Sequence, residues 1–305
     1  MVSISVITPS FNQGSFITAT IDSVLGQEGV DLQYMVLDGG SSDETVSILK
    51  SYGSRLSWVS EPDKGQSDAI NRGFALAKGE ILGWLNSDDL YVPGTLAKVA
   101  AEFERDTNLM LLYGKANHVD ANGEFLNEYP CAEFRLEALS YGCFICQPAC
   151  FFRRSLFEAA TGLDPSLQYA FDLDLWIKFG LLKQKNPHWG YNYIPQLLAC
   201  SRMHRGSKTI GRRHEAYLEI ITVVKKHFNH VPFNWIYGAE ETASGPYDGY
   251  FRRRPFSLLL FLKSLSKWAW SNRHDPIYIL RIIEECSRHP RQSADRIGNR
   301  IGERF

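Results

Sequence analysis

The chain has 305 residues, with 33 Lys and Arg against 34 Asp and Glu, and 44% of its residues are hydrophobic. This apolar content is enough to bury a sizeable core, which excludes collagen-like, low-complexity and intrinsically disordered chains. At roughly 150 residues per domain, the length predicts one large domain with an appendage, or two domains.

The net charge of −1 is the sum of two unlike parts. Residues 251–305 contain twelve Lys or Arg and five Asp or Glu, a net charge of +7, which leaves −8 on residues 1–250. No stretch reaches the ~18 apolar residues of a membrane span, and the apolar N-terminus lacks the basic flank and cleavage site of a signal peptide. The six Cys fit a reducing compartment, so a cytoplasmic location is expected.

The first 113 residues alternate short β-like runs with helical patterns. The expected strands are residues 3–8, 32–37, 56–59, 81–85 and 109–113. The expected helices are residues 16–25, 43–52, 66–78 and a segment after Pro93-Gly94. Ser41 and Glu44 have the spacing of a capping box, and Gly79 stands where a helix C-cap belongs. This order predicts an α/β fold with a doubly wound, mostly parallel sheet flanked by helices.

After Tyr113 the pattern changes. Ala121-Asn122-Gly123 predicts a hairpin between residues 115–120 and 124–129, followed by a strand over 148–152 and a helix over 173–182. From about residue 213 the patterns are helical, with a loop rich in Pro, Gly and Tyr expected at Gly238–Tyr250.

Polar residues follow three expected strands, where ligands of open α/β sheets bind. They are Thr8-Pro9-Ser10-Phe11-Asn12, Asp38 and Asn86-Ser87-Asp88-Asp89. No glycine-rich phosphate-binding motif is present, which argues against an NAD enzyme or a P-loop NTPase. The adjacent carboxylates of Asp88 and Asp89 favour a bound Mg²⁺ or Mn²⁺ that also takes diphosphate oxygens. An Asx-type turn before Pro93 is the alternative.

Five blocks occur in a fixed order over residues 3–94. They are Thr8-Pro-Ser-Phe-Asn, Leu37–Thr45, Asp68–Gly73, Ala77–Glu80 and Trp84–Gly94. This series resembles the N-terminal blocks of family-2 glycosyltransferases, which share the nucleotide-sugar-binding GT-A fold. The resemblance continues through Gln147–Phe157 and Phe171–Trp176 and fades after about residue 215. It implies a catalytic domain over 1–215, with a nucleotide-sugar-binding half (1–113) and an acceptor-binding half (114–215), and a basic helical C-terminal extension over 216–305.

The resemblance also assigns roles to matching positions. The donor-binding residues it implies are Thr8, Pro9, Phe11, Asp38, Asp68, Arg72, Asn86, Ser87 and His204. Asp38 would bind the base, often uracil, and Phe11 would stack near it. Asp88 matches the direct ligand of Mn²⁺ or Mg²⁺. Asp89 and His204 are further candidate ligands, since Asn86 stands where the family has an Asp. For His204, a solvated loop position is the alternative.

Asp172 matches the catalytic base of the family, with Phe171 in place of the preceding Glu. Its alternative role is to stabilise the N-terminus of a helix. One direct displacement assisted by one base would invert the anomeric centre. The expected function is therefore an inverting, hexosyltransferase-type glycosyltransferase of cell-envelope polysaccharide biosynthesis. It would move a sugar from a nucleoside-diphosphate donor, with a UDP-sugar favoured, to a hydroxyl of a glycan, lipid-linked or polysaccharide acceptor.

Two other classes of function stay open from the sequence. A metal-dependent nucleotidyltransferase would also bind a diphosphate on an α/β sheet, but it should have a Gly-rich, basic loop after the first strand. A non-catalytic nucleotide-sugar-binding or assembly protein would be expected to lack Asp88 or Asp172, and both residues are present.

The basic tail has a composition of its own. Residues 256–270 are apolar with two Lys and two Trp, and Arg252-Arg253-Arg254 precede them. This is typical of a helix at an anionic membrane interface, so residues 251–305 are a candidate for peripheral contact with the inner face of the cell membrane. A core helix packed on the catalytic domain is the alternative. No nucleic-acid partner is expected, because the tail lacks a recognition motif.

Overall fold

The computed structural model describes residues 2–243, 257–275 and 280. The chain divides into two compact units. They are Met1–Phe134 with Phe144–His204, and Arg135–Cys143 with Arg205–Phe305. The domain boundary at 215 that the resemblance implies stays a prediction.

Within the described residues, nine strands form one sheet in the first unit. They are β1 (Ser3–Ser10), β2 (Asp31–Asp38), β3 (Ser57–Ser60), β4 (Ile81–Trp84), β5 (Leu90–Tyr91), β6 (Leu109–Val119), β7 (Phe125–Glu128), β8 (Cys150–Arg153) and β9 (Gly190–Arg202). Their order is β3-β2-β1-β4-β8-β6-β9-β5, with β7 paired to β6. Strands β3, β2, β1 and β4 run parallel, β8 is antiparallel to both neighbours, and β6 and β9 are parallel.

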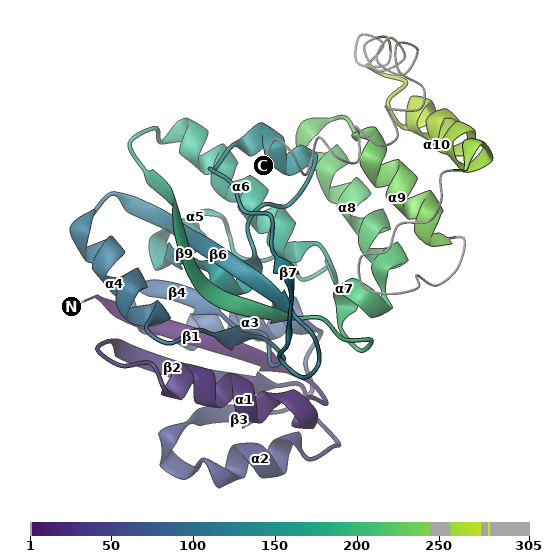
Figure 1. Cartoon of the computed structure of the whole chain (residues 1–305). Helices are drawn as coiled ribbons and strands as arrows, with labels where there is room; N and C mark the ends of the chain where they lie inside the picture. The colour runs from purple at the N-terminus through teal and green to yellow at the C-terminus, as the bar shows by residue number, and fades with distance from the viewer. Residues whose placement is uncertain (1, 244–256, 276–279, 281–305) are drawn as a thin grey trace. The chain divides into compact units, whose positions relative to one another are not determined.

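Helices flank both faces of this sheet (Figure 1). They are α1 (Gly14–Leu25), α2 (Thr45–Ser51), α3 (Gln66–Leu76), α4 (Thr95–Arg105), α5 (Arg154–Ala159) and α6 (Phe171–Lys185). Successive side chains of a strand point to opposite faces. Ile4 and Val6 of β1 accordingly join a buried cluster with α1, α2 and α4, whereas Ile7 faces Gly73 of α3. The predicted α/β fold class is confirmed.

Aromatic rings fill the face covered by α3, α5 and α6. Phe152 of β8 has its ring centroid 5.9 Å from that of Phe74 and 5.2 Å from that of Phe179. Trp84 of β4 stacks on Trp176 of α6, with centroids 5.7 Å apart and planes 16° from parallel. These contacts fix the position of α6 against the end of β4.

The structure corrects one expected helix cap. Helix α3 ends at Leu76 and its C-cap residue is Ala77, not Gly79. A Cβ atom on Gly79 would lie 2.4 Å from the backbone N of Ser5. Gly79 is therefore required by close backbone packing on β1 rather than by a cap.

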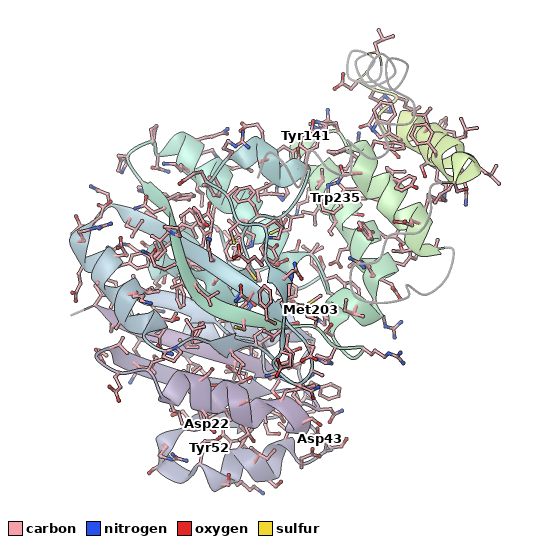
Figure 2. The ribbon with its side chains drawn as sticks, in the orientation of Figure 1. Asp22, Asp43, Tyr52, Tyr141, Met203 and Trp235 are labelled. Atoms are coloured by element: carbon pink, nitrogen blue, oxygen red, sulfur yellow. The ribbon has the colours of Figure 1, made fainter. Side chains whose placement is uncertain are left out.

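The second unit is helical in its described part. Its helices are α7 (Lys208–Gly211), α8 (Arg213–Phe228), α9 (Phe233–Ala243) and α10 (Leu258–Ser271). Val231, Phe233, Ile236, Phe261 and Trp268 form its buried cluster. Trp235 of α9 donates from Nε1 to the carbonyl oxygen of Ser140 at 2.6 Å, which ties segment 135–143 to this unit; Figure 2 labels Trp235 and the adjacent Tyr141.

The loop expected from Gly238 is wrong for its first six residues, because α9 continues to Ala243. A Cβ atom on Gly238 would lie 2.5 Å from Cε1 of Tyr217, so this glycine allows α8 and α9 to pack closely. Residues 244–250 lie outside the described residues. Across the part of the chain that the structure describes, no helix is long and apolar enough to cross a bilayer.

Candidate functional site

The carboxyl ends of β1, β2 and β4 meet at one edge of the sheet. Ser10 is in register with Asp38 across β1 and β2, and Ile7 with Trp84 across β1 and β4. The polar segments that the sequence singled out follow these strands. They are therefore brought together where ligands of open α/β sheets bind.

Asp38 is almost fully buried, at 2% exposure, and its carboxylate is held by the loop after β2 and by the end of β3. Oδ2 accepts hydrogen bonds from the N–H groups of Gly40 (3.2 Å) and Ser41 (2.9 Å) and from the hydroxyl of Ser60 (2.6 Å). Oδ1 accepts from the hydroxyl of Ser41. A carboxylate has about four lone-pair sites, so Oδ1 keeps the capacity for a further donor. The Ser41–Glu44 capping box is wrong, because Ser41 binds Asp38 and α2 has no side-chain cap.

The loops after β1 and β2 are joined by hydrogen bonds. Asn12 accepts from the N–H of Ser42 at 2.9 Å, and its own N–H donates to the hydroxyl of Ser41 at 2.7 Å. Asp43, labelled in Figure 2, accepts from the N–H of Gly14 at 2.9 Å. Asp43 is an exposed residue, and slight desolvation by its neighbours opposes its ionisation, but hydrogen bonds from Thr45 and Gly14 outweigh this effect and lower the pKa of the carboxyl. Phe11 stays 60% exposed beside this network.

Thr8 and Pro9 lie within β1 and are buried. The hydroxyl of Thr8 is 0% exposed and lies 3.0 Å from the hydroxyl of Tyr34 of β2. Its side chain therefore faces the core rather than the edge of the sheet, and its expected contact with the donor would have to come through the backbone.

Asp88 and His204 form a pair at this edge, although 116 positions separate them. His204 Nε2 lies 3.0 Å from Asp88 Oδ2, and the two side chains keep 11% and 16% exposure. The ring of His204 packs against Phe16 of α1, with centroids 4.5 Å apart. Met203, labelled in Figure 2, is buried and donates its N–H to the carbonyl of Val119 at 2.8 Å, which fixes the chain just before His204.

Asp89 points away from this pair. It is 3% exposed, its Oδ1 accepts from the N–H of Arg202 at 2.8 Å, and its Oδ2 accepts from the amide of Asn86 at 3.0 Å. Burial, and next the charge of Asp88, raise the pKa of Asp89 well above its usual range. This geometry argues against the expected metal-ligand role of Asp89 and assigns it to holding Asn86 and β9.

Asn86 and Ser87 form the start of the same turn. Asn86 Oδ1 accepts from Nε2 of Gln66, the first residue of α3, at 2.7 Å. Ser87 is buried at 4% exposure. Gln66 was not singled out from the sequence, although it lies two residues before Asp68, where a block that resembles the family begins.

Arg202 is the second residue that the sequence did not single out. Its Nε donates to the carbonyl of Asp88 at 2.8 Å and its Nη1 to the carbonyl of Ala121 at 2.7 Å. The guanidinium also lies over the ring of Phe16, 5.2 Å from the centroid. The sequence feature that could have pointed to Arg202 is a charged residue at the end of a largely apolar segment, two positions before His204.

The pair of Asp88 and His204 fits a divalent cation. Two ligand atoms at about 2.1 Å on adjacent corners of an octahedron are about 3.0 Å apart, which is the observed Oδ2–Nε2 distance. Mg²⁺-type sites commonly combine one or two protein ligands with waters and substrate phosphates. Among the described residues, no three His, Cys, Asp or Glu side chains gather into a metal site.

Asp68 and Arg72 lie on α3, beside the same edge. Asp68 is in the first turn and accepts from the N–H of Lys64 at 3.2 Å. Arg72 is one turn further on and forms an ion pair with Glu61, which follows β3. Both side chains keep partial exposure.

Asp172 is the second residue of α6 and is half-buried. Its Oδ1 accepts from the N–H of Leu173 at 2.7 Å. The N-cap position belongs to Ala170, so Asp172 is not the N-cap residue. A carboxylate in the first turn is still favoured by the helix dipole.

The start of α3 contacts both the turn that carries Asp88 and the loop that leads to Asp172. Gln66 binds Asn86, whereas the hydroxyl of Ser67 donates to the carbonyl of Leu167 at 3.3 Å. A Cβ atom on Gly65 would lie 2.9 Å from Oε1 of Gln168. Together with the Trp84–Trp176 stack, these contacts position α6 relative to the β4 edge.

This arrangement can be compared with known proteins. A family model described as "Glycosyl transferase family 2" matches residues 5–160, just over half of the chain. The chain belongs to glycosyl transferase family 2. This membership favours sugar transfer over the nucleotidyltransferase alternative.

Curated relatives of this family-2 chain include glycosyltransferases of several bacteria. An uncharacterized glycosyltransferase of Rickettsia typhi is 28% identical over 220 residues, covering 68% of this chain and 65% of that protein. Chondroitin synthase of Escherichia coli is 28% identical over 179 residues, covering 57% and 26%. A PGL/p-HBAD biosynthesis glycosyltransferase of Mycobacterium bovis is 36% identical over 158 residues, covering 50% and 60%. The chain thus spans between 26% and 65% of the length of these relatives.

Solved structures with similar folds contain nucleotide-sugars. TarS of S. aureus in complex with UDP-GlcNAc matches with a TM-score of 0.58 and 18% identity, over 88% of this chain and 81% of that chain. The mannosyltransferase PcManGT from Pyrobaculum calidifontis, in complex with GDP-Man and Mn²⁺, matches with a TM-score of 0.51 and 18% identity, over 89% and 72%. The predicted GT-A fold is confirmed.

Proposed function

We propose that this chain transfers a sugar from a UDP-sugar donor to a hydroxyl group of a glycan, lipid-linked or polysaccharide acceptor, with inversion at the anomeric carbon. The observation that carries the proposal is the pairing of Asp88 with His204 at the sheet edge that also holds Asp38 and Phe11. The diphosphate and the nucleobase of a donor can be bound side by side there.

Three groups at this edge suit the nucleoside. Oδ1 of Asp38 can accept the N3–H of uracil, because only one donor reaches it from the residues after β2. The exposed ring of Phe11 offers a stacking surface. The hydroxyl of Ser10 is buried and has no hydrogen-bond partner among the described residues, which marks it as a further polar contact for a ligand. The structures of TarS with UDP and UDP-GlcNAc support the choice of uridine.

Asp88 and His204 would hold Mn²⁺ or Mg²⁺. The bound cation would neutralise charge on the leaving diphosphate. The protein's part is to present the two ligands at a fixed spacing. Phe16 packs on His204, and Arg202 binds the backbone of Asp88. The PcManGT complex with Mn²⁺ supports a metal-dependent donor site.

Asp172 would act as the base. As the acceptor oxygen attacks the anomeric carbon, the bond from that carbon to the diphosphate breaks and the hydroxyl proton passes to Asp172. One displacement with one base inverts the configuration. The acceptor class is proposed from the chondroitin synthase relative, whose name specifies a polysaccharide product.

The test is a transfer assay of Asp172→Asn against the wild-type protein. Loss of a general base should lower kcat about 10²–10⁴-fold, while UDP affinity by calorimetry stays unchanged. Asp31→Asn, at the opposite end of β2, is the control and should retain full activity. Proton NMR of the wild-type product should show the inverted anomer. Wild-type turnover in Asp172→Asn, or a retained anomer, would refute the assigned mechanism.

A further inference from the structure

Among the described residues, helix α10 packs against the rest of the second unit through one face. Phe261, Ser264 and Trp268 on this face are at most 7% exposed, and they belong to or flank the cluster with Phe233 of α9. Trp268 donates from Nε1 to the carbonyl of Val231 at 2.9 Å. These contacts fix the rotation of the helix about its axis, and therefore which residues face outward.

The outward face of α10 is apolar at three positions. Leu259 is 79% exposed, Leu262 is 53% exposed and Trp270 is 69% exposed. With Ser266 between them, they follow the three- and four-residue spacing of a single helix face. The face of a surface helix that contacts water is usually polar. Three large apolar side chains on such a face therefore indicate a surface that binds a partner.

Cations border this apolar face. Lys263 and Lys267 lie along one flank and are 59% and 54% exposed, and they share the single carboxylate of Glu240. Two ammonium groups on one carboxylate leave a net positive charge. At the end of the face, the guanidinium of Arg273 lies 4.4 Å from the centroid of the Trp270 ring.

The sequence on both sides of α10 is also basic. Arg252-Arg253-Arg254 precede it, and residues 276–305 carry six Arg against four Asp or Glu; both segments lie outside the described residues. The segments before and after α10 thus both carry a net positive charge.

We propose that the outward face of α10, defined by Leu259, Leu262 and Trp270 with Lys263, Lys267 and Arg273, docks on the interface of an anionic lipid bilayer. Leucines and tryptophan enter the headgroup region while the cations meet anionic headgroups. A second copy of the chain would bring like charges together across a two-fold axis. Residues 276–305 of the same chain are another candidate to cover this face, but they are net positive as well. Neither a second copy nor these residues would therefore offer the charge complementarity of an anionic membrane.

The test is co-sedimentation of the full chain with vesicles. Phosphatidylcholine vesicles are compared with vesicles that also contain phosphatidylglycerol. Each basic residue near an anionic surface should raise partitioning roughly five-fold, so binding should be strong only with the anionic lipid. It should drop at least about ten-fold in about 0.5 M NaCl, where the screening length is only a few Å.

The double variant Leu259→Glu/Leu262→Glu tests the face itself. Both side chains are exposed, so the variant should keep the wild-type Tm and lose at least about ten-fold in partitioning. Leu218→Glu on α8, where the leucine is 48% exposed, is the matched control and should bind as the wild type does.

Four results would overturn the proposal. They are equal recovery with both kinds of vesicle, unchanged binding of the double variant, a wild-type dimer that the double variant abolishes, and a Tm lowered only in the double variant. The third would assign the face to a second copy of the chain, and the fourth would assign it to residues 276–305.

Discussion

At the scale of single residues, Arg202 connects the elements that present Asp88 and His204. Its guanidinium binds the carbonyls of Asp88 and Ala121, and it is 7% exposed. The planar fork of Arg can satisfy both carbonyls at once, which a Lys ammonium on a flexible stem does less well. Arg202 therefore acts as a positioning residue for the proposed metal site.

Arg202→Lys should keep the charge but leave one partly buried carbonyl without a donor. We expect about 10–100-fold weaker Mn²⁺ binding and a loss of about 1–3 kcal/mol in the free energy of unfolding. Mn²⁺ titration followed by electron paramagnetic resonance, together with urea denaturation, measures both. Arg105→Lys, whose side chain is 70% exposed, should change neither. Equal Mn²⁺ affinity in the two variants would rule out the positioning role.

The candidate site could be predicted from the sequence only in part. The blocks located Asp38 and Asp88 because the two residues lie at or shortly after the carboxyl ends of β2 and β4. The resemblance assigned the metal to Asp88 and kept Asp89 as a further candidate, because the sequence does not show that Asp89 is drawn inward by Arg202, 113 positions later. The inward direction of the Thr8 side chain was hard to predict from the sequence for a related reason. Strand β1 is covered on both faces, so no polar–apolar alternation marks which side chains point inward.

At the scale of elements, the N-terminus of α3 depends on Gly65. This residue has φ +115° and ψ 176°, a conformation that only glycine adopts readily. It places Gln66 against Asn86 and lies beside Gln168. The geometry of Gly65 therefore contributes to the position of both carboxylates of the proposed mechanism.

Gly65→Ala should cost about 1–3 kcal/mol in the free energy of unfolding because of backbone strain, and it should also weaken UDP binding. Urea denaturation and calorimetry measure the two effects. Gly53→Ala is the control, because Gly53 has φ +57° and a Cβ atom there meets nothing within 4 Å. It should cost about 1–2 kcal/mol and leave UDP affinity unchanged. If both variants bind UDP like the wild type, α3 does not position the site.

Glu240 links α9 to α10 through Lys263 and Lys267. Burial would raise its pKa, but the hydrogen bonds and charges of the two Lys outweigh burial and lower this pKa below the ordinary value of 4.5. A carboxyl with a lower pKa in the folded state stabilises the fold above its unfolded pKa. This stabilisation is lost as the pH falls through the folded-state pKa.

Glu240→Gln should therefore destabilise the protein most at neutral pH, and the difference from wild type should shrink below about pH 4.5. Urea denaturation across this pH range measures the difference. Glu128→Gln, at a carboxylate whose side chain is 68% exposed, should show little difference at any pH. A difference for Glu240→Gln that does not change with pH would contradict the assigned ion pair.

Element positions followed well from sequence periodicity where a local pattern was strong. Apart from the two-residue strand β5, which was not predicted, the strands and helices of the first 113 residues lie close to the predicted ranges. Strand β9 was missed, because its 13 residues have no regular alternation and it pairs with distant β6. The end of α9 was missed because glycine usually signals a loop, whereas Gly238 serves close helix packing.

At the scale of the whole molecule, the match to the family model ends before the site is complete. It covers residues 5–160, whereas Asp172, Arg202 and His204 come later. Helix α6 and strand β9 bring these residues back to the first unit. The charge of the chain is also uneven. Residues 1–250 are net negative and contain the carboxylates of the proposed site, whereas residues 251–305 carry the excess of cations.

The central claim is that Asp88 and His204 bind a nucleoside diphosphate through a divalent cation. Calorimetric titration of UDP with and without Mn²⁺, on the wild type and on Asp88→Asn, tests it most directly. We expect Mn²⁺ to raise the UDP affinity of the wild type at least about ten-fold and to have no effect on Asp88→Asn. Asp31→Asn should behave as the wild type does. Equal UDP affinity of the wild type with and without Mn²⁺, or the same enhancement in Asp88→Asn, would contradict the claim.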